Sequence, residues 1–308
     1  MAIHKLQWQL FFWLVFSNVL FAQNKFENYQ FRIIKEGTSK RAVSSIVQDN
    51  YGFTWIGTNG AGLYRYDGVN YIGYEYNLKK SGSVNSNVIY ATYVDDKNNL
   101  WIGTDEGLCL YNRDSDQFTK IKIEDVVAKG YAEPITVKCI IQDNQGNLIL
   151  GTYGYGLILL NKKTLKAKKI ESRLINLKDF QIKDFAKNKK GVVFFGSNFG
   201  MFYFDSNYQI RPIFKDKFKK IPVTESIESM VVDKNDFIWI GTTSDGLFKI
   251  KIDNDTYQFQ NFPITKHKVL SIIKNSQNII VCGTENDGLI TVDNSGAIIK
   301  KYLHSKYD

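Results

Sequence analysis

The stretch Gly52-Phe53-Thr54-Trp55-Ile56-Gly57-Thr58-Asn59-Gly60-Ala61-Gly62-Leu63 contains two short motifs that return throughout the chain. The first is a bulky apolar pair followed by Gly and then Thr or Ser, and the second is Gly followed by Leu or Met. The first motif begins at positions 55, 101, 149, 194, 239 and 281, so the copies are 42 to 48 residues apart. Internal repetition at that spacing, in a chain of short strand-like runs, is typical of β-propeller blades.

The first repeat has the content of four strands. Runs rich in β-branched and aromatic residues occupy Val43–Val47, Phe53–Thr58, Gly62–Tyr66 and Val69–Tyr76, and turn formers such as Asp67-Gly68 separate them. Four short strands in about 45 residues make one propeller blade. We therefore predict an all-β fold, a β-propeller of four-stranded antiparallel blades.

Six repeats are present, near residues 43–76, 88–123, 137–170, 182–214, 227–262 and 269–303. Residues 26–34 resemble a lone fourth strand with no preceding three, although residues 297–303 already provide a fourth strand for the sixth repeat. An orphan outer strand at the N-terminus is what a propeller needs for closure by strand exchange. The count therefore indicates an incomplete seven-bladed ring, with one further repeat expected beyond Asp308.

The two glycines of each repeat have different expected roles. The first ends a strand where neighbouring sheets press together, so a Cβ atom there would block the approach of the next blade. The second begins a strand after a tight loop, where left-handed backbone is expected. A bulky residue before the first glycine should fill the space between blades; the six are Trp55, Trp101, Ile149, Phe194, Trp239 and Val281.

Residues 1–22 do not belong to the repeats and have the proportions of a secretory signal peptide. Lys5 precedes the apolar run 10–16, and small residues end the segment, so we expect cleavage between Ala22 and Gln23. The apolar run is short for a bilayer-spanning helix, which needs about 20 residues; an uncleaved anchor is the alternative. Residues 23–308 form the predicted propeller domain, which is expected to be exported.

The charge and the cysteines indicate no special chemistry. The formal net charge is +9, and a basic surface can attract nucleic acid, anionic polymers or a membrane. An exported protein seldom meets nucleic acid, and the lysines fall mostly in turns and outer strands, so we predict a solvated role for them and no nucleic-acid partner. Cys109, Cys139 and Cys282 fall in strands of different repeats and are expected to be small buried hydrophobic residues.

Residues 42–67 closely resemble the two-component regulator propeller repeat, through Val43–Asp49, Gly52–Thr58 and Gly62–Gly68. Such repeats form the periplasmic sensor of hybrid two-component histidine kinases from Bacteroidetes-type bacteria. The resemblance implies a periplasmic propeller that detects a ligand, often a glycan fragment, and passes the signal across the inner membrane. It also implies dimer contacts within a larger receptor.

In that family two seven-bladed propellers usually precede an immunoglobulin-like domain, a membrane helix and a kinase. This chain, with six repeats, resembles the N-terminal piece of such a sensor or a degenerate stand-alone relative. Kinase activity and membrane attachment would then belong to a missing C-terminal region.

In a propeller the loops that join second to third strands lie on one face, which is the usual binding surface. The residues expected to bind ligand in these loops are Asn59, Asp105, Glu106, Tyr153, Tyr155, Asn198, Phe199, Asp245, Glu285 and Asp287. They combine carboxylates, amides and aromatic rings, which suit sugar hydroxyls and sugar faces. Tyr153 and Tyr155 are the preferred anchor. The alternative is that these are ordinary turn residues, because Asn, Asp and Gly are common in turns.

Catalytic and metal sites are not indicated. The sequence has three histidines (His4, His267 and His304), which is too few for a clustered metal site. The acidic loop residues could in principle supply an acid and a base for sugar cleavage, but turn roles for such residues are commoner. We predict a ligand sensor that is not an enzyme and has no cofactor or metal. The alternative is a stand-alone secreted propeller, either a polysaccharide-active enzyme such as a lyase or a glycan-binding scaffold.

Overall fold

The computed structural model describes residues 41–123, 134–172, 177–205, 207–213, 226–253 and 256–303. These residues all belong to one compact unit that spans Gly37–Asp308. The expected signal peptide (1–22) and the expected orphan strand (26–34) lie outside the described residues. No helix of the described ranges is long and apolar enough to cross a membrane.

The strands form six antiparallel sheets of four, each ordered as in the sequence. Blades 1 and 2 comprise β1 (Val43–Gln48), β2 (Thr54–Thr58), β3 (Leu63–Tyr66), β4 (Tyr71–Tyr74), β5 (Ile89–Val94), β6 (Leu100–Thr104), β7 (Gly107–Asn112) and β8 (Gln117–Ile121). Blades 3 and 4 comprise β9 (Val137–Gln142), β10 (Leu148–Thr152), β11 (Leu157–Leu160), β12 (Ala167–Ile170), β13 (Ile182–Lys187), β14 (Val193–Ser197), β15 (Gly200–Phe204) and β16 (Ile210–Pro212). Blades 5 and 6 comprise β17 (Ile227–Val232), β18 (Ile238–Thr242), β19 (Leu247–Asp253), β20 (Thr256–Phe262), β21 (Val269–Lys274), β22 (Ile280–Thr284), β23 (Leu289–Val292) and β24 (Ile298–Tyr302).

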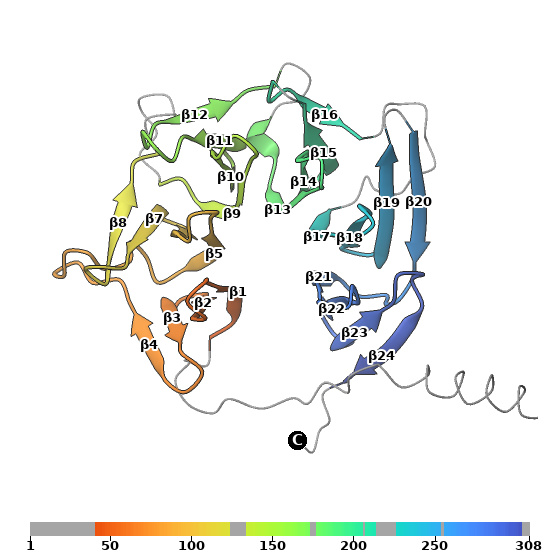
Figure 1. Ribbon diagram of the computed structural model, residues 1–308, viewed down its shortest axis with the longest axis horizontal. Helices are drawn as coiled ribbons and strands as arrows, with labels where there is room; N and C mark the ends of the chain where they lie inside the picture. The colour runs from red at the N-terminus through yellow and green to blue at the C-terminus, as the bar shows by residue number, and fades with distance from the viewer. Residues whose placement is uncertain are drawn as a thin grey trace, which may run out of the picture. The chain divides into compact units, whose positions relative to one another are not determined.

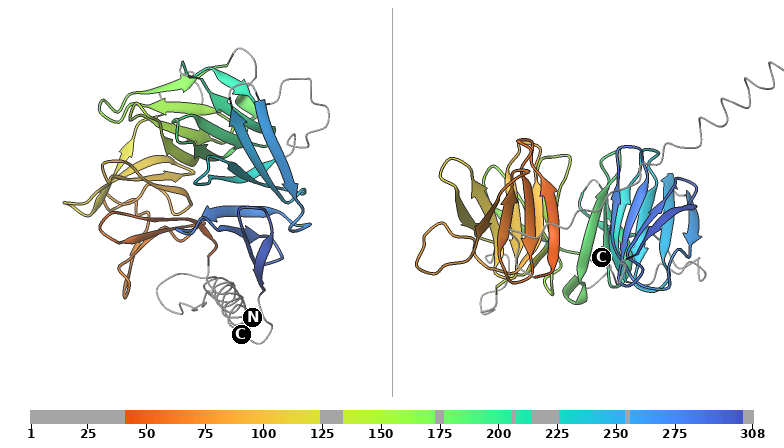
Figure 2. Two further views of the ribbon diagram at one scale, coloured as in Figure 1. Left: turned by 45° about the vertical axis from the view of Figure 1, so that its right-hand side comes forward. Right: turned by 90° about the horizontal axis from the view of Figure 1, so that it is seen from below.

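The six sheets stand around a common axis, with the first strand of each blade innermost (Figure 1). Consecutive inner strands β1, β5, β9, β13, β17 and β21 are neighbours, and the fourth strands lie at the outside. Figure 2 shows the blades from the side as radially packed sheets. The predicted all-β propeller of four-stranded blades is confirmed. The one helical element among the described residues is a 3₁₀ turn at Leu177–Asp179.

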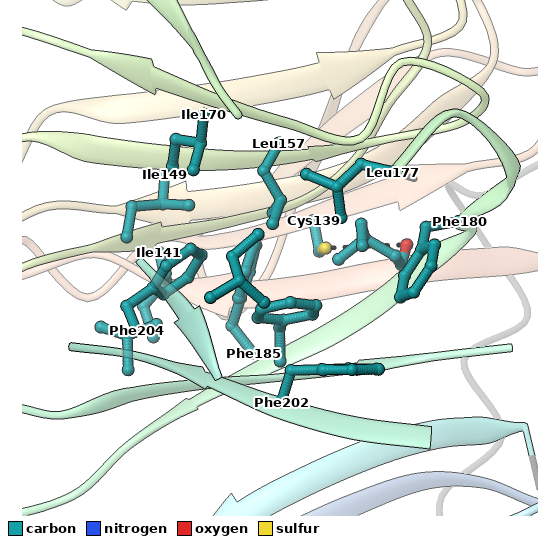
Figure 3. Close-up of a cluster of buried hydrophobic side chains, with 14 of the residues drawn as sticks. Cys139, Ile141, Ile149, Leu157, Ile170, Leu177, Phe180, Phe185, Phe202 and Phe204 are labelled. Atoms are coloured by element: carbon teal, nitrogen blue, oxygen red, sulfur yellow. Dashed lines mark hydrogen bonds between the residues drawn. The ribbon is translucent and has the colours of Figure 1, made fainter. Parts of the chain in front are cut away.

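Apolar side chains from facing sheets form a core cluster between each consecutive pair of blades. Between blades 3 and 4, Leu157 and Ile149 of one sheet pack against Phe185, Phe195 and Phe202 of the next (Figure 3). The other four clusters join blades 1 and 2, 2 and 3, 4 and 5, and 5 and 6. Each sheet is apolar on both faces for this reason, as expected of a strand layer between two others. The three cysteines are free and buried, which confirms their expected role.

Both roles predicted for the repeat glycines are confirmed. A Cβ atom on Gly151 would lie 2.6 Å from Cγ2 of Ile182 in the next blade, and one on Gly241 would lie 2.7 Å from Cγ1 of Val269. A side chain at these positions would therefore push the blades apart. The second glycine of every repeat has a positive φ, for example +76° at Gly62, which L-residues adopt at a cost.

At the turn between the first and second strands, a carboxylate in each of blades 1 to 3 is held by a side chain of the next blade. Asp49 Oδ2 in blade 1 lies 3.0 Å from Arg113 Nη1 in blade 2. Asp95 Oδ2 in blade 2 lies 2.9 Å from Lys162 Nζ in blade 3. The Asp143 carboxylate in blade 3 accepts a hydrogen bond from the Tyr208 hydroxyl in blade 4. These inter-blade carboxylate contacts lie where the first strand of each blade turns into the second.

The faces at the two ends of the row of blades are open. Ile46 of β1 is 65% exposed, whereas the equivalently paired Ile140 of β9 is 8% exposed. Ile273 of β21 is 62% exposed, whereas its equivalent Ile141 is 9% exposed. A Cβ atom on Gly283 of blade 6 would meet its own blade and no following one. Among the described residues, no core cluster joins blade 6 to blade 1. The expected seventh blade stays a prediction.

Candidate functional site

The residues predicted to bind ligand lie at one end of the blades, in the loops between second and third strands, and several are held by neighbouring protein groups. Asn198 Oδ1 accepts a hydrogen bond of 2.8 Å from the backbone N–H of Gln181. Glu285 Oε1 lies 3.4 Å from Lys268 Nζ. The carboxylate of Asp287 accepts a hydrogen bond from the Thr265 hydroxyl. Asn198 and Asp287 thereby tie their loops to neighbouring segments, whereas Glu285 pairs with an exposed lysine.

Three others take part in the loops mainly through their backbone. Asn59 donates its backbone N–H to the carbonyl of Ala42 at 2.9 Å, and its side chain is exposed. Asp245 donates its backbone N–H to Thr242 Oγ1 at 3.1 Å. The exposed Glu106 accepts an amide hydrogen bond of 3.0 Å at its carbonyl. These contacts are those of ordinary turns.

The aromatic candidates differ from one another. Tyr153 is 52% exposed, while Tyr155 packs against the core between blades 2 and 3. Phe199 is half exposed and lies against Phe180, with ring centroids 4.9 Å apart. The structure therefore separates the predicted Tyr153–Tyr155 pair, and Tyr153 is the ring that a ligand can reach.

A group of charged and aromatic side chains that the loop analysis missed lies beside Tyr153. It comes from the second residue of each inner strand, a position that is polar in blades 2 to 5: Tyr90, Lys138, Lys183 and Glu228. All four are half-buried. We call these four residues, with Asp105 and Tyr153 from the loops, the inner-strand cluster.

Lys138 is the centre of this cluster. Its Nζ lies 3.1 Å from the ring centroid of Tyr90 and 6.0 Å from that of Tyr153. A cation over an aromatic face is attracted by the negative charge of the π-system. Burial and the like charge of Lys183 lower the pKa of Lys138 to about 8, and the charge of Asp105 acts in the opposite direction.

Asp105 contributes an unusual carboxylate. Its Oδ1 is buried and has no hydrogen-bond partner among the described residues. The backbone carbonyl of Asp105 accepts a hydrogen bond of 3.4 Å from Thr136 Oγ1, and this contact holds the loop. Burial, and secondly the negative charge of Asp105, raises the pKa of Tyr90, so the phenol stays neutral. A buried acceptor without a donor costs free energy, and a ligand hydroxyl could reach this one only if the loop moved.

Lys183 and Glu228 form the other half of the cluster. Their Nζ and Oε2 atoms are 3.4 Å apart. Glu228 Oε1 accepts hydrogen bonds from Ser226 at 3.1 Å and from Thr243 at 3.3 Å. Three neighbouring elements thus orient the carboxylate, and Lys183 is already partly neutralised.

The inner-strand cluster offers groups that can bind the ring faces, the hydroxyls and the charges of a ligand. Tyr153 offers an exposed ring, Asp105 an acceptor, and Lys138 a donor. No group of three or more His, Cys, Asp or Glu residues within the described ranges could hold a metal ion. The second position of the inner strand was the sequence signal for this site, because it breaks the apolar pattern in four successive repeats.

Two cavities lie at the end of the blades opposite the inner-strand cluster. One of about 290 Å³ between blades 3 and 4 is lined by Asp143, Lys190 and Tyr208 among others. A second of about 660 Å³ lies beside Lys249 and Asn294 of blades 5 and 6. Tyr208 donates to Asp143 and Lys249 donates to the Asn294 carbonyl, so these polar groups are engaged in holding blades together. We therefore place the candidate site at the inner-strand cluster.

A family model described as two component regulator propeller matches residues 38–60 and 83–106. The chain resembles a two-component regulator propeller. The match falls on the first two repeats, where the Trp-Ile-Gly-Thr motif is complete. None of the curated proteins matches the chain.

Solved structures share the fold. The extracellular domain described as part of a hybrid two component system of B. thetaiotaomicron is 23% identical, with a TM-score of 0.72 over 90% of this chain. A second extracellular domain from that organism, described as part of a one component system, is 22% identical with a TM-score of 0.73 over 91%. This chain spans 37% and 36% of the length of those two proteins.

Virginiamycin B lyase from Staphylococcus aureus is also similar in structure, with a TM-score of 0.68 and 8% identity. That similarity covers 87% of this chain and 86% of the lyase. At such low identities the likenesses describe the propeller fold alone. They do not distinguish a sensor from an enzyme.

Proposed function

We propose that this chain is the ligand-sensing propeller of an exported two-component signal-transduction receptor and binds a glycan-derived ligand at the inner-strand cluster. The regulator propeller repeats and the extracellular two-component domains of the same fold support the sensor role. The signal peptide expected at residues 1–22 would direct the chain to the periplasm. Phosphoryl transfer would belong to another part of the receptor, and the propeller would act through ligand binding and homodimer contacts.

The observation that carries this proposal is the placement of Lys138 near the exposed ring of Tyr153, with the charge of Asp105 acting on the same lysine. Sugar rings stack on aromatic faces with their C–H groups, while their hydroxyls need both donors and acceptors. The cluster has each of these, and its partners come from blades 2 to 5. A ligand there would contact several blades at once, which is a means of coupling binding to the arrangement of the blades.

Calorimetric titration of the full chain, purified after export, against plant and host oligosaccharides tests the proposal. We expect one saccharide class to bind, and Tyr153→Ala to weaken it at least 10-fold through lost stacking. Tyr51→Ala is the matched control, because Tyr51 is an exposed ring with the cation of Arg113 4.8 Å from its centroid at the opposite end of the blades. Equal losses in the two variants would place the ligand elsewhere.

The same samples should be analysed for saccharide cleavage by mass spectrometry. A sensor leaves the bound saccharide intact over hours, whereas the enzyme alternative consumes it. Cleavage that disappears in a Tyr153→Ala or Lys138→Gln variant would replace the sensor proposal by a lyase or hydrolase.

A further inference from the structure

We propose that the site binds an acidic ligand, whose anionic group, a carboxylate or a sulfate ester, pairs with the ammonium group of Lys138 beside Lys183. This inference rests on the proposed function and adds the chemical class of the ligand. It is carried by the contacts of the two lysines and of the groups around them.

Lys138 has unused donors. No hydrogen bond or ion pair with the described residues engages its Nζ, whose contacts are the rings of Tyr90 and Tyr153. An ammonium group has three N–H donors, and water or a ligand must take them. The exposed lysines of the outer strands are hydrated in bulk water, but Lys138 is half-buried, so its cation is incompletely solvated.

The two lysines of the cluster are matched in number by two carboxylates, but no carboxylate of the described residues forms an ion pair with Lys138. Lys183 acts on Lys138 as a like charge, and its own partner is Glu228 at 3.4 Å. The negative charge of Asp105 raises the pKa of Lys138, yet the two side chains form no ion pair. An anion in contact with Lys138 would relieve the repulsion between the two lysines and gain a charge-assisted hydrogen bond.

The rest of the cluster favours a sugar as the carrier of that anion. The Tyr153 ring lies next to the ammonium group, so a saccharide could stack there while its acidic substituent reaches Lys138. Uronic acids and sulfated sugars both combine a ring face, hydroxyls and an anion.

Binding should be linked to the protonation of Lys138. The charged and titratable groups that face it are Lys183, Asp105, Cys139, Tyr90 and Tyr153. Because the pKa of Lys138 is lowered to about 8 in the free protein, part of the population is neutral at pH 8. An anion stabilises the ammonium form and raises this pKa, so binding at pH 8 takes up protons and weakens at higher pH.

The first test is calorimetry of the full chain with matched pairs of ligands. The pairs are a uronic-acid disaccharide with its carboxyl-reduced neutral form, and a sulfated disaccharide with its desulfated form. We expect the acidic member of one pair to bind at least 10-fold more tightly, and the pair that does so identifies the anion. Proton uptake should appear as a buffer-dependent enthalpy at pH 8.

Two lysine variants test whether Lys138 causes the preference for the acidic ligand. Lys138→Gln should reduce the preference for the acidic member to below 2-fold. Lys163→Gln, an exposed lysine of the same blade, should keep the full preference. Equal binding of both members of each pair by the wild-type chain, or a preference that survives Lys138→Gln, would overturn the inference and leave the sensor proposal standing.

A second measurement does not depend on a saccharide. NMR titration of the lysine side chains, with Lys138→Gln for assignment, gives the pKa of Lys138 in sodium sulfate and in sodium chloride of equal ionic strength. We expect the pKa to be at least half a unit higher in sulfate. No difference would overturn the anion site. A difference without any saccharide binding would keep the anion site and contradict the glycan-sensing proposal.

Discussion

The indole N–H of Trp101 donates a hydrogen bond of 3.0 Å to Oδ2 of Asp95, six residues earlier in the same blade. The same spacing and contact recur for Trp55 with Asp49 at 2.8 Å and for Trp239 with Asp233 at 3.0 Å. The carboxylate also accepts the backbone N–H groups of its turn. The motif tryptophan therefore fills the space between blades and at the same time fixes the turn that precedes its strand.

Two of the repeats without tryptophan have asparagine in place of the turn aspartate. In the fourth and sixth repeats, where Phe194 and Val281 replace tryptophan, the turn residue is Asn188 or Asn275 instead of Asp. Their amide oxygens still accept the turn N–H at 2.9 and 2.8 Å. An amide is sufficient there because no indole N–H has to be satisfied.

Asp95→Ala should destabilise the chain more than Asn275→Ala. Burial raises the pKa of Asp95, but hydrogen bonds from Lys162, Trp101 and Asn99 lower it to about 2, so the carboxylate is charged and fully used. Its removal leaves the buried indole N–H unpaired and takes one of two carboxylate partners from Lys162, which keeps Asp96 at 2.6 Å, so the loss should be about 2–3 kcal/mol. Asn275→Ala loses a turn acceptor, at about 1 kcal/mol. Urea unfolding at pH 7 measures both, and equal losses would contradict the role assigned to the carboxylate.

The stability of the blade 4–blade 5 contact should fall as the pH rises from about 4 to 6. Burial raises the pKa of Asp184 to about 6, although its carboxylate accepts hydrogen bonds from Met230 N–H, Phe185 N–H and the Ser229 hydroxyl. The carboxylate is enclosed, while the residue as a whole keeps some exposed surface. Because the folded state holds a proton that the unfolded state releases, ionisation costs up to about 3 kcal/mol.

Asp184→Asn removes this titration. The free energy of unfolding of the wild-type chain, relative to the variant, should therefore decrease between pH 4 and pH 6.5. Asp205→Asn is a control of opposite sign: hydrogen bonds and Arg211 outweigh burial and lower the pKa of Asp205, so the wild-type advantage should be lost as the pH falls below 4. A pH-independent difference for Asp184→Asn would show that its carboxylate is solvated.

Gly241→Ala and Gly283→Ala should differ although they occupy the same place in the repeat. A Cβ atom on Gly241 would lie 2.8 Å from the backbone oxygen of Val269 in the next blade, which cannot move without moving the sheet. We expect a loss of about 2–3 kcal/mol from overpacking. At Gly283 the near atom is Oγ of Ser271 in the same blade, which can rotate, so the loss should stay within about 1 kcal/mol. Comparable losses would place a seventh neighbour against blade 6.

Charges should be tolerated on the open faces and not inside the ring. Ile46→Lys and Ile273→Lys should change stability by less than about 0.5 kcal/mol, as surface substitutions do. Ile140→Lys and Ile141→Lys, at the equivalent buried positions, should cost more than about 3 kcal/mol because they bury an unpaired charge. Thermal unfolding of the four variants tests this. A large loss at Ile46 would mean that another sheet covers that face in solution.

The sequence predicted the blades because the repeat copies the local physics of one sheet. Glycine at 62 or 246 is needed by a positive φ, and glycine at 151 by the close approach of the next blade; both requirements are readable in a single repeat. The loops were located for the same reason. Their individual roles were not, since the difference between Tyr153 and Tyr155 depends on which ring faces the neighbouring blade.

The inner-strand cluster was missed because its members are one repeat apart. Tyr90, Lys138, Lys183 and Glu228 come together through the curvature of the ring, and each appears alone as a half-buried strand residue. Comparing equivalent positions across repeats, rather than residues within one loop, would have found them. The burial of Asp105 Oδ1 leaves no mark in the sequence pattern and is seen only in the three-dimensional structure.

The inter-blade carboxylate contacts also link the completion of one blade to the presence of the next. Asp49 receives its cation from Arg113, and Asp95 receives its cation from Lys162, so each early blade depends on a residue of the repeat that follows. In a chain that crosses a membrane with its N-terminus first and folds on the far side, those residues arrive later than the sheet that needs them. A blade would then stay incompletely neutralised until its successor had crossed, and slow translocation between two repeats would prolong the life of a half-finished sheet.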